Sequence, residues 1–71
     1  MTNTEIADKA NAINKKITDA VAELYNFYDE LNGESKIPTA SKQMIGHAYK
    51  IVLTGSFIVR DFEIEMRASE A

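Results

Sequence analysis

The chain has 71 residues, no cysteine, a single histidine and a formal net charge of −3. One hydrophobic core is marginal at this size, and without cysteine no disulfide or thiolate metal site can reinforce it. A lone histidine does not make a structural zinc site, and an acidic chain is a poor partner for duplex DNA. We therefore expect no metal or cofactor, and we expect self-association to supply the missing stability.

Membrane and export signals are not evident in the sequence. No apolar run reaches the roughly 18 residues of a membrane span, and the first residues lack a basic segment followed by an apolar one. We expect one domain over residues 1–71 in a cytoplasmic protein with no membrane partner. If a phage encodes the protein, that cytoplasm is the host cell's.

The first helix is predicted over about residues 3–31. Thr2 and Glu5 have the spacing of a capping box, and Gly33 suits a left-handed C-cap. Apolar residues between them follow a heptad seam, typical of helices packed at a shallow angle. The predicted seam is Ile6, Ala10, Ile13, Ile17, Ala20, Leu24, Phe27 and Leu31.

Residues 32–38 read "NGESKIP" and predict a loop. Pro38 disfavours helix at Ile37 but suits the first turn of a following helix. Thr39 or Ser41 is expected to cap that helix.

The second half allows two interpretations. Alternation in "FEIEMR" and many branched residues favour a β-hairpin that turns at Thr54-Gly55-Ser56. A second heptad favours one helix over about 39–67, with Gly55 allowing a close backbone approach at a cost of about 1 kcal/mol in helix propensity. Its seam is Ile45, Ala48, Val52, Gly55, Val59, Phe62 and Met66. We favour the helix, because the first helix needs a partner of its own length.

This second helix has a further apolar stripe on its other side, formed by Tyr49, Leu53, Phe57 and Ile64. One partner helix covers only one side. The fold class predicted is therefore all-α, an antiparallel two-helix hairpin that assembles into a homo-oligomeric, coiled-coil-like bundle. A dimeric four-helix bundle is the smallest solution, and a ring of hairpins also satisfies the pattern. The predicted oligomer interface is Ala48, Val52, Gly55, Phe57, Val59 and Phe62.

No catalytic constellation is visible, so we expect a protein that is not an enzyme. His47 and Ser56 have no neighbouring partner in the sequence for nucleophilic catalysis. The acids Asp61, Glu63 and Glu65 alternate along a helix, do not share a face, and are expected to be solvated.

Three groups of residues are candidates for ligand binding. Tyr25, Tyr28 and Tyr49 could stack on bases, or they could simply pack. The basic residues Lys15, Lys16, Lys42, Lys50 and Arg60 could contact phosphates, or they could only make the surface soluble. Thr39 and Ser41, at the start of the second helix, could help to hold an anion, or they could act only as caps.

The stretch "AYKIVLTGSFIVRD" resembles the second helix of small phage proteins that sequester cyclic oligonucleotide alarm signals, the anti-CBASS sponges. Ala48, Gly55, Phe57 and Arg60 carry the resemblance, with the phenylalanine one residue late and the arginine one residue early. The family's Arg-Trp pair before the alanine is missing, and Gln43-Met44 stands there. The resemblance implies a helical oligomer that holds cyclic nucleotides between protomers, and an anti-defence role.

Three functions follow as hypotheses. The first is a sponge that binds a cyclic oligonucleotide. The second is a phage- or plasmid-type inhibitor or adaptor that binds a host protein through its acidic helical surface. The third is an RNA-binding hairpin dimer, against which the net negative charge counts.

Overall fold

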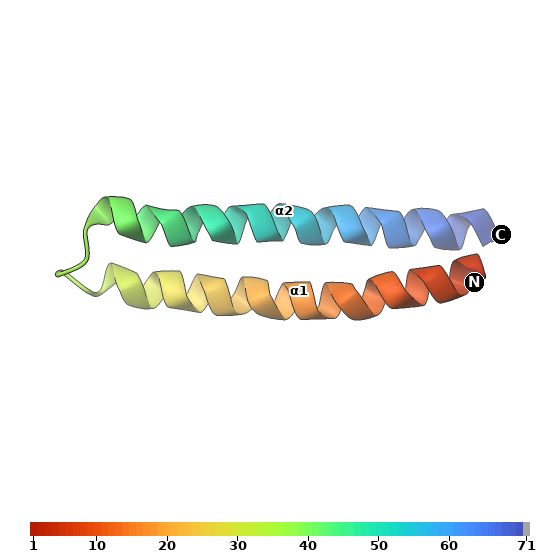
Figure 1. Cartoon of the computed structure of the whole chain (residues 1–71), viewed down its shortest axis with the longest axis horizontal. Coiled ribbons are helices and arrows are strands. Elements are labelled where there is room, and N and C mark those ends of the chain that lie inside the picture. The colour runs from red at the N-terminus through yellow and green to blue at the C-terminus, as the bar shows by residue number, and fades with distance from the viewer. Residues whose placement is uncertain (71) are drawn as a thin grey trace.

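The computed structural model describes residues 1–70 as a hairpin of two long antiparallel helices (Figure 1). Helix α1 spans Asn3–Asn32 and helix α2 spans Thr39–Glu70. The hairpin measures 54 × 15 × 14 Å, and its two ends of chain lie together, opposite the loop. Because no strand occurs within residues 1–70, the all-α hairpin is confirmed and the β-hairpin alternative is wrong.

Helix α1 begins as predicted and ends differently. The Thr2 hydroxyl accepts from the Glu5 amide at 3.1 Å, and the Thr2 amide donates to the Glu5 carboxylate at 3.4 Å, which completes the capping box. Gly33, however, is right-handed with φ −81°, so the expected left-handed cap is wrong. The amides of Gly33 and Glu34 donate to the carbonyls of Glu30 and Leu31, and this tightened turn ends the helix without a change of hand.

Helix α2 starts directly after Pro38, whose carbonyl accepts the first backbone bonds of the helix. The amides of Ser41 and Lys42 both donate to the Pro38 carbonyl, at 3.0 and 3.1 Å. Thr39 and Ser41 are the first and third residues of the helix itself, so the expectation that one of them precedes it as a cap is wrong. The helix also continues three residues past the predicted end, to Glu70.

The Thr54-Gly55-Ser56 stretch stays helical because its hydroxyls bond within the helix. The Thr54 hydroxyl donates to the Lys50 carbonyl at 2.9 Å, and the Ser56 hydroxyl donates to the Leu53 carbonyl at 2.8 Å. Such bonds to the preceding turn satisfy polar groups that would otherwise favour a turn.

The seam, meaning the residues through which each helix faces the other, is rotated from the predicted one on α1. Along α1 it runs through Ala7, Ala10, Asn14, Ile17, Val21, Leu24, Tyr28 and Leu31, all buried or half-buried, and Ile6 and Ala20 beside it are half-buried too. Four of the eight predicted seam residues lie on this column, while Ile13 and Phe27 are 55% and 46% exposed. Two neighbouring heptad columns of α1 are apolar, and a single partner helix covers only one of them.

Helix α2 shows the same rotation. Its covered positions are Ile45, Tyr49, Val52, Ser56, Val59, Glu63 and Met66. The predicted Gly55 does not face α1: a Cβ built on it would meet no atom within 4 Å. The glycine at the close approach is Gly46, where a Cβ would lie 2.9 Å from the Tyr28 ring.

The hairpin by itself encloses very little. Among the described residues, the buried side chains are Ala7, Ala10 and Ser56. Large apolar side chains are left at the surface, and these include Ile51, Phe57, Ile58, Phe62 and Ile64. Neither helix, over its described residues, has the length and apolarity needed to cross a bilayer.

Candidate ligand groove

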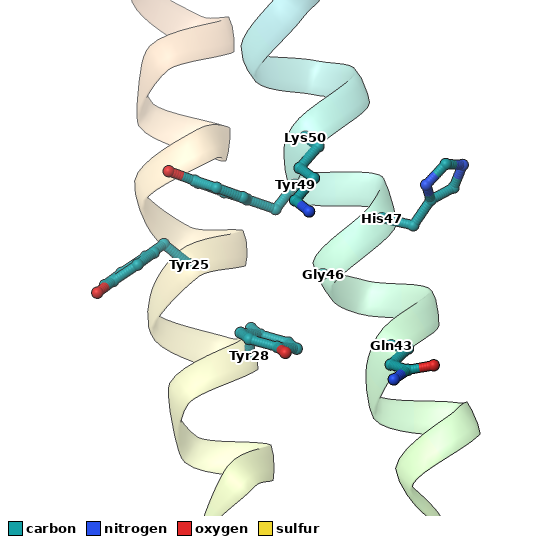
Figure 2. A pocket seen from close by; sticks show the side chains of 7 residues that line it. All are labelled: Tyr25, Tyr28, Gln43, Gly46, His47, Tyr49 and Lys50. Carbon is teal, nitrogen blue, oxygen red and sulfur yellow. The ribbon is translucent and has the colours of Figure 1, made fainter.

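A groove of about 600 Å³ crosses both helices in the half of the hairpin nearest the loop (Figure 2). It is lined by Tyr25 and Tyr28 from α1 and by Gln43, Gly46, His47, Tyr49 and Lys50 from α2. We call it the tyrosine groove. All three tyrosines that the sequence predicts as stacking platforms lie in it.

Two of the three tyrosines form an aromatic pair. The rings of Tyr25 and Tyr49 are 5.6 Å apart and tilted by 53°, within the range of favourable aromatic pairs. Tyr28 and Tyr49 stand on the seam and are half-buried, whereas Tyr25 is 56% exposed. The seam thus holds two rings in place and leaves the third accessible to a ligand.

Gly46 lets the Tyr28 ring lie against the backbone of α2. A Cβ at this position would be 2.9, 3.2 and 3.4 Å from the ring's Cε2, Cζ and Cδ2 atoms. Any side chain here would displace Tyr28 and change the groove. Gly46 lies off the predicted heptad seam and Gly55 lies on it, so the sequence pattern points to close packing at Gly55 instead.

The polar groups of the groove come from one strip of α2. Figure 2 shows Gln43 and His47 on the side of α2 away from α1, and Tyr49 reaching across towards α1. Lys50 is the one charged side chain among the lining residues, and no acid lines the groove. The spacing of Gln43, His47 and Lys50 by four and three residues places them on neighbouring turns, a signal that the sequence does contain.

The other predicted ligand residues do not line this groove. Lys15 and Lys16 lie about ten residues before Tyr25 on α1, roughly 15 Å along the helix. Arg60 lies a similar distance beyond Lys50 on α2. The remaining three, Thr39, Ser41 and Lys42, stand at the start of α2, where Lys42 is half-buried. Because the amides of Ser41 and Lys42 already bond to Pro38, they are not available to an anion.

A second polar cluster joins the helices near their free ends. Arg67 donates to Asp8 at 3.0 Å and to Glu63 at 2.9 Å, and the Asn11 amide donates to Glu63 at 3.1 Å. The Glu63 side chain is only 15% exposed, so its expected solvation is wrong. The hydrogen bonds from Asn11 and then Arg67 hold the pKa of Glu63 below its ordinary value.

The same cluster raises the pKa of Arg67, first through its hydrogen bond to Asp8 and then through Glu63. Because the charges of this cluster are paired with one another, we interpret it as a structural link between the ends of the two helices. Within residues 1–70, no three acidic or histidine side chains gather as a metal site would require.

No family model, curated protein or solved structure matches this chain.

Proposed function

We propose that this protein is a small, non-enzymatic, homo-oligomeric binding protein whose tyrosine groove captures a cyclic oligonucleotide. The observation that carries the proposal is the convergence of Tyr25, Tyr28 and Tyr49 with Lys50 in a groove that no acid lines. The resemblance of α2 to phage sponges of such signals supports the same ligand class.

The chemistry of the groove matches flat bases joined by phosphates. Stacking on an aromatic side chain is worth about 1–3 kcal/mol per base, and a hydrogen bond to a charged group about 1.5–3 kcal/mol. Lys50 supplies the charge, while Gln43 and His47 offer polar groups at the rim. The three tyrosines come from one chain, so each protomer presents all of them in one groove.

The homo-oligomeric part of the proposal rests on the apolar surface. A hairpin whose described residues include two buried alanines and one buried serine leaves ten large apolar side chains exposed to water. Association is the available way to bury them in a chain without cysteine.

Calorimetric titration with a panel of cyclic di- and trinucleotides tests the ligand. We expect Tyr25→Ala and Lys50→Ala each to weaken binding at least tenfold, which corresponds to about 1.4 kcal/mol. Matched controls are Phe57→Ala, an exposed aromatic outside the groove, and Lys15→Ala, a lysine outside it. These two variants should bind as the unaltered chain does.

Two results would count against the proposal. Absence of heat at ligand concentrations near ~100 µM would exclude a useful sponge and would favour a host-protein partner. Weakening by Lys15→Ala but not by Lys50→Ala would place the ligand outside the tyrosine groove.

A further inference from the structure

One long side of the hairpin is apolar and uncovered. This side is formed by the residues that immediately precede the seam positions in each helix. Ile58 is the most exposed isoleucine on it, at 64%. We call this side the outer face, and its main members are Ile13, Ala20, Phe27, Ile51, Ile58 and Phe62.

These residues share a face because of how antiparallel helices pair. On the groove side, the contacts between the helices involve residues that come one position after a seam residue. Tyr25 contacts Tyr49, Gly46 contacts Tyr28, and Arg67 pairs with Asp8. Residues that precede seam positions turn to the opposite side on both helices. The outer face therefore points away from the tyrosine groove.

We infer that the outer face binds the outer face of a second copy, with α1 against α1, α2 against α2, and the two loops at opposite ends. This inference rests on the proposed homo-oligomer and specifies its geometry. The five large side chains of the outer face each present about 100 Å², so the two copies together would bury roughly 1,000 Å². That area is about what a specific interface needs.

Residue size fits a two-fold axis at the middle of the face. In three contacts between the helices the residue numbers add to 74, so Ala20 lies within one residue of the level of Gly55. Small residues from both helices thus lie at the centre of the face, where two backbones can come close.

Large residues then meet small or complementary ones on either side of that axis. Antiparallel pairing about Gly55 brings Ala48 opposite Phe62 of the second copy, and places Ile51 within one residue of Ile58. Pairing about Ala20 brings Ile13 opposite Phe27 of the second copy. In this arrangement, helix α2 of the second copy fills the open space beside Gly55.

The charged residues beside the outer face indicate which helix of the second copy lies against each helix of the first. Lys9, Lys16, Glu23 and Glu30 are exposed, repeat every seven residues along the rim of the outer face, and form no ion pair with the described residues. Antiparallel pairing of α1 with α1 sets Lys9 opposite Glu30 and Lys16 opposite Glu23. The alternative, α1 against α2 with both loops at one end, sets Lys16 and Glu23 against Ile58 and Ile51. The first arrangement matches charge with charge and apolar with apolar.

Cysteine cross-linking tests the geometry, because the chain has no native cysteine. We expect Ala20→Cys to form a disulfide-linked dimer on mild oxidation, since the two copies of this position meet at the axis. Ser35→Cys, in the loop, should stay unlinked because the loops are at opposite ends. Cross-linking of Ser35→Cys without cross-linking of Ala20→Cys would refute this arrangement but would still indicate a homo-oligomer.

A charge exchange provides an independent readout by sedimentation equilibrium. Lys16→Glu should weaken dimerisation roughly tenfold, and adding Glu23→Lys should restore it. Lys15→Glu is the matched control, since Lys15 lies off the rim, and it should have little effect. Equal effects of the two lysine variants would refute the α1–α1 pairing. A native chain that stays monomeric at micromolar concentration would refute the homo-oligomer itself, whatever the ligand titration shows.

Discussion

Gly46 provides the sharpest test of the packing between the helices. In an open helix, replacing glycine by alanine stabilises by about 1 kcal/mol. At Gly46 the new methyl group would lie 2.9 Å from the Tyr28 ring, and overpacking of this kind costs about 1–3 kcal/mol. We therefore expect Gly46→Ala to leave stability unchanged or to lower it by up to about 2 kcal/mol.

The cause can be isolated by removing the ring. In a Tyr28→Ala background the clash is absent, so the added Gly46→Ala should stabilise by the full ~1 kcal/mol of helix propensity. The double-mutant cycle should thus give a coupling free energy of about 1–3 kcal/mol between the two positions. Urea unfolding followed by far-ultraviolet circular dichroism, at one fixed protein concentration, measures all four free energies.

One result would refute this reasoning. If Gly46→Ala stabilised the chain by about 1 kcal/mol in both backgrounds, Tyr28 would not lie against Gly46. Gly46 is on the groove side and Tyr28 is on the seam, both away from the outer face, so the comparison does not depend on the proposed dimer interface.

Thr2→Ala should lower stability by about 1 kcal/mol, measured by urea unfolding, because the Glu5 amide loses its capping hydroxyl. A variant as stable as the parent would contradict the capping box. The depressed pKa of Glu63 means that its contribution to stability is present at neutral pH and is lost as pH falls through the folded-state pKa, below its ordinary value. Glu63→Gln should remove this part of the acid dependence in pH-dependent urea unfolding, and an unchanged profile would show that the bonds to Asn11 and Arg67 do not matter.

The sequence predicts both helices, the loop and the antiparallel arrangement, because helix starts, loop residues and heptads are local signals. It does not predict which apolar column of each helix faces the other. Ile13 and Tyr28 belong to neighbouring columns with similar apolar content, and the choice between them depends on how side chains fit across the pair. The pairing of Tyr28 with Gly46 is such a fit.

The candidate site, like the fold, is predicted by the sequence only in part. The three tyrosines are visible in the sequence as aromatic residues, but their meeting depends on the rotated seam, which brings Tyr49 to face α1. Lys50 stands in the sequence beside other lysines with nothing to single it out. Its role as the one charge lining the groove follows only from three-dimensional placement.

The composition of the seam changes along the hairpin, and this gradient bears on how the chain folds. Near the loop the seam carries Leu24, Tyr28 and Tyr49, whereas towards the free ends Val59 and Met66 alternate with small or polar residues such as Ala7 and Asn14. The loop half also has the shortest chain to close, so its contacts are the least costly in entropy. Folding should therefore start at the loop and zip towards the termini. In the native state, amide hydrogens near the free ends should exchange with solvent first, ahead of those beside the tyrosine groove.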